Sequence, residues 1–242
     1  MLSSKVIPMV KLPEVVGDYM SRTTGLREFC DRCLRTERWG GNVVLMIVDA
    51  AFDSIGLNYF NSVVPKVIEF EKAFVRGGEI RSLEDLSNLP IDWALDIWRN
   101  ERSWNVARSV ASHLHELGGK ESLGDREAFR RWAAGSRLEE WREDPIGRIR
   151  GIGVTTYQYL RMMGGVDTAM PDKVVRRVVE EMLHRADVRM PTRGDIELVH
   201  TIDRMASITG YRPIEICWMS WLVQPEGDAI RMEKHRGILD RI

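Results

Sequence analysis

Two glycines one residue apart, Gly151 and Gly153, stand between two segments with apolar periodicity. Because glycine has no Cβ, it can adopt positive φ or let the backbone approach another chain closely. The pattern predicts a helix, a tight hairpin and a second helix. The first amides of that second helix have no intrahelical acceptor and form an anion site. A hairpin with no side chains at its tip can place these amides against a nucleic-acid phosphate.

The residues around the glycine pair resemble the helix–hairpin–helix motif of DNA-repair glycosylases, the superfamily of endonuclease III and the alkylpurine glycosylases. The matching run is Ile149-Arg150-Gly151-Ile152-Gly153-Val154-Thr155-Thr156. In that family an essential aspartate follows the hairpin after a Gly/Pro-rich connection, and here Asp172 comes 19 residues after Gly153. The run 172–178 also resembles the family's Asp-x-x-(Val/Ile)-x-Arg-Val. The resemblance covers 134–181 and extends more loosely over 42–117.

The resemblance implies a catalytic role for Asp172. Its carboxylate would stabilise the positive charge that develops on the sugar as the N-glycosidic bond breaks, or would activate water. A structural interpretation is compatible with this role, because an aspartate at this position also caps the helix that begins at Lys173. Members that also cut the backbone carry a lysine two residues after the second hairpin glycine. Thr155 stands there in this chain, so we expect a monofunctional glycosylase without lyase activity.

The implied partner is double-stranded DNA that contains a damaged or mismatched base, flipped out of the duplex. The expected DNA contacts come from the hairpin and its arginines: Arg148, Arg150, Gly151, Ile152, Gly153, Val154, Thr155 and Thr156. Family hairpins often hold a monovalent cation through backbone carbonyls, and by position these would be Gly147, Ile149 and Ile152.

The expected base pocket contains Tyr157, Trp104 and Asp49. For each of the two aromatic residues, the alternative is a place in the core. Asp49 lies alone in the apolar run 43–52. Because a buried carboxylate without a partner is costly, Asp49 lies at an exposed helix end, is satisfied by nearby donors, or is a second active-site acid. The family's Ser-Ala-Gln signature is replaced by Asp49-Ala50-Ala51, which puts in doubt the contact that its glutamine makes to opened DNA.

Charge and cysteine content limit the other classes of function. The formal net charge is −1, so any DNA contact must use local positive charge. Cys30, Cys33 and Cys217 form no disulfide framework. Cys30 and Cys33 have metal-site spacing but no second pair, so helical cysteines are the favoured interpretation. We expect no iron–sulfur cluster, no zinc site and no required cofactor.

The whole chain predicts an all-α fold of short helices with two helical subdomains and an active-site cleft between them. Residues 42–163 would form a six-helix barrel-like subdomain that ends in the helix–hairpin–helix. Residues 1–41 and 164–242 would form the second subdomain, which carries the aspartate. Helices are expected at 26–34, 43–52 with Asn42 as N-cap, 63–74, 82–86, 91–98, 104–117, 125–134, 138–141, 174–183, 196–208 and 213–223. An extended lead-in is expected at 6–16, and a polar, frayed tail over the last fifteen residues.

Two other functions stay open. The first is a non-catalytic helix–hairpin–helix scaffold that binds DNA, and the near-neutral charge favours it. The second is a helical protein-interaction domain in which the hairpin is coincidental. No apolar run reaches the ~18 residues of a membrane span, and no signal sequence is apparent, so we expect the protein in the cytoplasm, at the nucleoid. The resemblance implies a monomer, because the motif class works as one.

Overall fold

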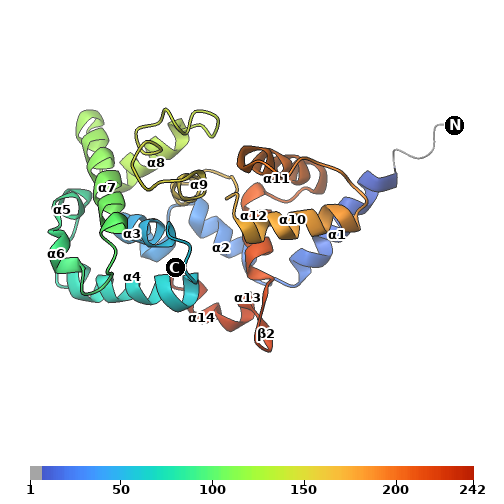
Figure 1. Cartoon of the computed structure of the whole chain (residues 1–242), viewed down its shortest axis with the longest axis horizontal. Helices are drawn as coiled ribbons and strands as arrows, with labels where there is room; N and C mark the ends of the chain where they lie inside the picture. Colours follow the sequence, from blue (N-terminus) through green and yellow to red (C-terminus); the bar gives the residue numbers. More distant parts are fainter. Residues whose placement is uncertain (1–6) are drawn as a thin grey trace. The chain divides into compact units, whose positions relative to one another are not determined.

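A computed structural model of the chain describes residues 7–242, with side chains from residue 11 onward, and it is built from helices (Figure 1). The expected all-α class is confirmed. The one pair of strands in the described residues is β1 (Pro225–Glu226) with β2 (Ala229–Ile230), which are antiparallel and pair Pro225 with Ile230. Residues 1–6, which include Val6 of the expected lead-in, lie outside the described residues.

The chain divides into two compact units. Unit 1 contains residues 1–32 and 167–242, and unit 2 contains residues 33–166. We expected the divisions at 41/42 and 163/164. The assignment of unit 2 as a glycosylase-type barrel stays a prediction.

Unit 2 is organised around the apolar helix α3 (Val43–Asp53), which packs against α4, α7, α8 and α9. Its residues from Val43 to Phe52 are all buried. The ring of Phe52 stacks on Trp98 at 4.4 Å between centroids and meets the edge of Trp104 at 4.9 Å. Burying a large apolar side chain stabilises a fold by roughly 1.5–3 kcal/mol, so this helix explains why unit 2 has a core of its own. The other elements of unit 2 are η1 (Arg38–Gly41), η2 (Tyr59–Val63), α4 (Val64–Phe70), η3 (Glu71–Val75), α5 (Leu83–Asn88), α6 (Ile91–Ala94), α7 (Glu101–Glu121), α8 (Asp125–Gly135) and α9 (Val154–Met163).

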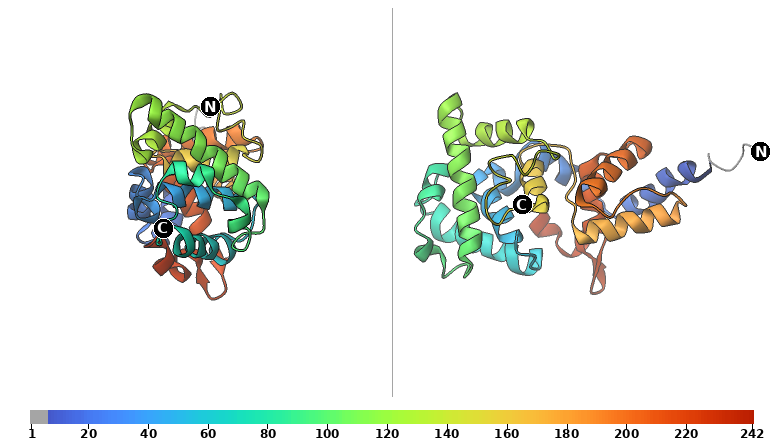
Figure 2. Two further views of the ribbon diagram at one scale, coloured as in Figure 1. Left: turned by 90° about the vertical axis from the view of Figure 1, so that its left-hand side faces the viewer. Right: turned by 45° about the horizontal axis from the view of Figure 1, so that its top comes forward.

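Helix starts in unit 2 follow side-chain caps that the sequence carries. Asn42 accepts a hydrogen bond from the Leu45 amide at 3.1 Å, as expected for the N-cap of α3. Ser82 and Asp85 form a reciprocal capping box at α5. Asn100 accepts from the Ser103 amide at 2.9 Å and begins α7, the 21-residue helix that stands out as a long green ribbon in Figure 2.

Unit 1 is organised around α12 (Pro213–Leu222), which packs against α1 (Ile7–Ser21), α10 (Lys173–Arg185), α11 (Asp195–Thr209) and α13 (Arg231–Lys234). Trp218 of α12 meets the ring of Phe29, which lies on α2 (Leu26–Leu34), edge to face at 5.0 Å. The remaining helix is α14 (Arg236–Leu239). The apolar faces expected at 174–183 and 213–223 are both buried here.

The expected extended lead-in is wrong for its described part, which belongs to the helix α1 despite Pro13. Leu12, Val16 and Tyr19 are buried, and α1 packs on α10, α11 and α12. Proline removes one helical hydrogen bond. The burial of this apolar face overrides that local cost, which the prolines alone could not indicate.

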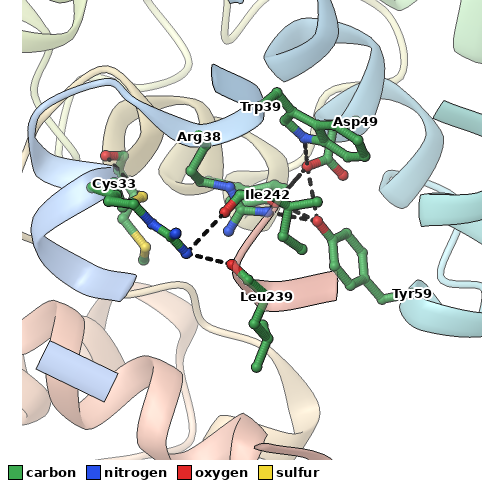
Figure 3. Close-up of polar contacts among 10 residues, drawn as sticks. Cys33, Arg38, Trp39, Asp49, Tyr59, Leu239 and Ile242 are labelled. Carbon is green, nitrogen blue, oxygen red and sulfur yellow. Dashed lines mark hydrogen bonds and ion pairs between the residues drawn. The ribbon is translucent and has the colours of Figure 1, made fainter. Parts of the chain in front are cut away.

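The expected frayed tail is also wrong, because β2, α13 and α14 occupy it. Met232, Leu239 and Ile242 are buried. The guanidinium of Arg32 donates hydrogen bonds to the carbonyls of Leu239, Asp240 and Ile242, two of which are labelled in Figure 3. Three apolar side chains and a cation from α2 therefore hold a segment whose composition is polar.

Candidate functional site

The segment before the glycine pair is a series of turns, so the helix expected at 138–141 and the first helix of the expected motif are corrected. α8 ends at Gly135, and the next helix is α9. The Asp144 carboxylate accepts from the Ile146 amide at 2.8 Å, and the Arg148 amide donates to the Asp144 carbonyl at 3.0 Å. These turns take the place of a helix. Pro145 has no N–H with which to continue a helix from 138–141, and Gly147 has a low helix propensity.

Two glycines are required by close packing in this turn and hairpin. A Cβ on Gly147 would lie 1.6 Å from the Trp141 carbonyl oxygen. Gly151 has φ +114°, and a Cβ there would lie 2.8 Å from Cγ2 of Val106 on α7. Arg102 of α7 donates to the Gly151 carbonyl at 3.4 Å. The hairpin therefore packs directly against α7.

Gly153 has a different role, because no atom lies within 4 Å of the Cβ that it lacks. It is the exposed N-cap of α9 and supplies no side-chain hydrogen bond to that helix. The first amides of α9, from Val154 to Thr156, therefore follow a residue that has no side chain to cover them. They form the kind of helix end that binds anions. Ile152, Val154 and Thr156 are buried, each with 8% of the residue exposed, so their side chains offer little surface to a ligand.

Cations lie beside this tip. Arg148 and Arg150 are exposed, as is Arg102. At the expected ion site, the carbonyl of Ile149 accepts a hydrogen bond from the Ile152 amide at 3.0 Å. The monovalent-ion site at Gly147, Ile149 and Ile152 stays a prediction.

Asp172 lies at the start of α10 and is partly exposed. Its Oδ1 accepts from the Val174 amide at 2.7 Å, which is the N-cap geometry expected from the sequence. Among the described residues, none donates a hydrogen bond to its Oδ2. The cap fixes the orientation of the carboxylate and leaves one oxygen available.

The two aromatic candidates for the base pocket are core residues in this structure. Trp104 is fully buried and donates from its indole nitrogen to the Trp98 carbonyl at 2.9 Å. Tyr157 is fully buried and meets Trp132 edge to face at 5.7 Å. A role in base stacking would require either ring to become exposed.

Asp49 lies within α3, not at its exposed end, and it is completely buried. Its Oδ2 accepts from Trp39 at 2.8 Å and from the hydroxyls of Tyr59 and Tyr159 at 2.9 Å each. Figure 3 shows the first two of these bonds meeting at the carboxylate. Arg38 is also fully buried and lies 3.3 Å from the same oxygen. Of the exposed helix end and the satisfaction by nearby donors that the sequence left open, the second therefore applies to Asp49. Its Oδ1 accepts no hydrogen bond from the described residues.

The backbone that supplies this cluster is unusual in two places. Trp39 has φ +53°, which is rare for a bulky side chain, and two glycines with positive φ follow it. Tyr59 begins the π-helix η2, a rare form that is frequently found at functional sites. We call Arg38, Trp39, Asp49, Tyr59 and Tyr159 the Asp49 cluster.

Electrostatics within the Asp49 cluster follow from its burial. Loss of solvent raises the pKa of the Asp49 carboxyl, while Arg38 and the three neutral donors act in the opposite direction. Burial also raises the pKa of Tyr59 and Tyr159 well above the ordinary value, so both remain neutral donors. Burial raises the pKa of the neighbouring Cys33 thiol to about 12. The cluster therefore places the Arg38 guanidinium, the Asp49 carboxyl group and two neutral hydroxyls together inside the core.

Sequence reasoning identified Asp49 but missed its four partners. Arg38 and Trp39 lie outside the apolar run 43–52 that draws attention to Asp49, and Tyr159 is 110 residues from Asp49. An isolated carboxylate in an apolar run was the one available signal, and it indicated that donors must exist without indicating which.

The cysteines are separate from one another in their contacts. Cys30 donates weakly to the Ile214 carbonyl, and Cys33 to the Met162 carbonyl at 3.5 Å. The Met170 amide donates to the sulfur of Cys217 at 3.3 Å. All three are buried. Within residues 7–242, no group of three or more His, Cys, Asp or Glu side chains is arranged to hold a metal ion.

Between Ile7 and Ile242, none of the helices is both long and apolar enough to cross a membrane. Comparison of the chain with protein-family models, with curated proteins and with solved structures found no match in any of the three.

Proposed function

We propose that this chain is a monofunctional DNA glycosylase that removes a damaged or mismatched base by hydrolysis of the N-glycosidic bond. The observation that carries the proposal is Asp172, a helix-capping aspartate with an available oxygen, 19 residues after a hairpin whose tip residue, Gly153, has no side chain in front of the first amides of α9. Together with the resemblance of the hairpin residues, this is the pairing of DNA-binding and catalytic groups that a glycosylase needs.

In this proposal the hairpin binds the DNA backbone. The amides that follow Gly153 donate hydrogen bonds to a phosphate, and Arg148 and Arg150 add positive charge next to it. These contacts carry no base information, so they position the duplex without selecting the lesion.

Asp172 performs the chemical step. As the bond from C1′ to the base breaks, the base leaves with the bonding electrons and positive charge develops on the sugar. The Oδ2 of Asp172 stabilises this charge and accepts a proton from the water that attacks C1′. Thr155 cannot form a Schiff base, so the product is an abasic site in an intact strand.

The test is base release from duplexes that each carry one lesion: alkylated purine, uracil or thymine opposite guanine, hypoxanthine or oxidised guanine. We expect strand breaks only after alkali, and none from Asp172→Asn. Asparagine is as good an N-cap as aspartate, so this variant removes charge and leaves the helix start intact. Asp125→Asn is the matched control, because Asp125 is also near a helix start and accepts from the Leu83 amide.

A covalent DNA complex trapped by borohydride would contradict the monofunctional assignment. Release that persists in Asp172→Asn would remove Asp172 from the mechanism.

The alternative is a DNA-binding scaffold without catalysis, and the burial of Trp104 and Tyr157 favours it, because neither ring is available to stack on a flipped base. A scaffold would bind duplex DNA and release no base from any lesion. Its affinity for DNA would be the same in the wild type and in Asp172→Asn.

A further inference from the structure

A polar groove of about 460 Å³ lies on unit 2 beside the hairpin. One wall is a face of α7 with Asn105, Ser109, Ser112 and His113, and the opposite side is the turn that contains Pro145 and Ile149. Hydroxyls, an amide and an imidazole therefore face a space bounded by the turn that leads into the hairpin.

The groove also has a fixed cation. Arg108 lines it and donates from Nε to the Ser87 carbonyl at 3.0 Å. This bond uses one of the five guanidinium donors and orients the rest. One acid, Glu116, also lines the groove, and it accepts from the Ser112 hydroxyl at 3.3 Å, on the last turns of α7. The groove is thus rich in donors near the hairpin and acidic at its far end.

The groove is continuous with the hairpin. Arg102, which donates to the Gly151 carbonyl, shares a face of α7 with Asn105 and Ser109, at i, i+3 and i+7. From Arg102 to Ser109 the helix rises about 10 Å at ~1.5 Å per residue. The hairpin contact and the groove residues therefore follow one another along a single face of α7.

We propose that this groove binds the sugar–phosphate backbone of the same DNA strand that the hairpin holds, and extends the contact along that strand beyond the hairpin. The inference rests on the proposed function for the identity of its partner. Neutral donors and one oriented guanidinium suit phosphodiester oxygens, whereas the acid at the far end limits how far the strand follows α7.

The test uses Ser109, which is exposed in the groove, and His115, which is exposed on another face of the same helix. The probe is a duplex with a tetrahydrofuran abasic analogue, and affinity is measured by fluorescence anisotropy between about 50 and 200 mM salt. Ser109→Glu places a negative charge beside the phosphates, and we expect binding about fivefold or more weaker at low salt, with less than about twofold for His115→Glu.

The reverse change guards against a folding artefact. Ser109→Lys adds a phosphate contact and should steepen the slope of log affinity against log salt by about 0.9, with no change for His115→Lys. Equal changes in affinity and in salt dependence for the variants at positions 109 and 115 would contradict the proposal that the groove binds DNA.

Failure of this proposal is distinguishable from failure of the proposed function. Weaker binding by Ser109→Glu without base release from any lesion would support the groove and contradict the glycosylase. Base release with no effect of Ser109→Glu on binding would support the glycosylase and contradict the groove. Absence of salt-dependent DNA binding would contradict both proposals.

Discussion

The Asp49 cluster makes the sharpest prediction for stability. Asp49→Ala removes the acceptor for Trp39, Tyr59 and Tyr159 and leaves the Arg38 guanidinium buried without its counter-charge. Breaking a buried ion pair from one side costs about 3–5 kcal/mol, mostly because of the charge that remains. We expect a loss of about 4 kcal/mol in the free energy of unfolding of unit 2, since the two tyrosine hydroxyls, 3.2 Å apart, can still bond to each other.

Asp49→Asn keeps the shape and an acceptor oxygen and should lose less, about 2–3 kcal/mol. The double variant Arg38→Met/Asp49→Leu removes both charges, and we expect it to be more stable than Asp49→Ala by at least about 2 kcal/mol, because apolar replacement of a buried pair is often close to neutral. Asp96→Ala, at an exposed aspartate of the same unit, is the control and should stay within about 0.5 kcal/mol of the wild type.

Urea unfolding at pH 7, followed by circular dichroism, measures the total loss. Hydrogen exchange of the α3 and α9 amides assigns the loss to unit 2. A cost below about 1 kcal/mol for Asp49→Ala, or a double variant no more stable than the single, would refute the argument that Asp49 neutralises a buried guanidinium.

Three further predictions concern the local structure. The raised pKa of Cys33 means that its contribution to stability is full below the ordinary value of 9.0 and is lost as pH rises toward about 12; by pH 10 wild type should lose about 1.4 kcal/mol more than Cys33→Ala in urea unfolding, and parallel pH profiles would contradict this. Gly151→Ala should cost about 2–3 kcal/mol because of its positive φ and the contact with Val106, whereas Gly153→Ala, with open space around it, should cost less than about 1 kcal/mol; equal losses in thermal unfolding would show that the hairpin is not seated on α7. Asp172→Ala should destabilise α10 by about 1 kcal/mol, and Asp172→Asn by a few tenths; a large loss in Asp172→Asn would mean that the carboxylate does more for the fold than cap a helix.

Several elements were predictable because their causes lie within a few residues. Asn42, Ser82 and Asp172 each cap a helix through an amide two or three residues later, so the cap and its helix start can be located in the sequence. The buried run 43–52 is similarly local, since a continuous apolar stretch of that length must be covered. Gly151 shows both possibilities that the sequence left open for a glycine there, since it has positive φ and its backbone lies close to Val106.

Other elements depend on contacts between distant residues. Pro13 lies inside a helix because α1 buries its apolar face on α10, α11 and α12. The carboxyl-terminal segment folds because Arg32 binds its carbonyls. The groove forms only where the turn before the hairpin meets α7.

Asp49 combines both kinds of cause. By itself the sequence determined that a carboxylate inside an apolar helix needs donors, since burial of an unpaired charge is costly. Which donors meet it was decided by tertiary structure alone, because Tyr59 and Tyr159 are brought to one oxygen by packing between α3 and α9 and by the π-helix at Tyr59. Hydrogen bonds are short and directional, so their partners are set by the positions that the packed helices take, and no spacing in the sequence encodes those positions.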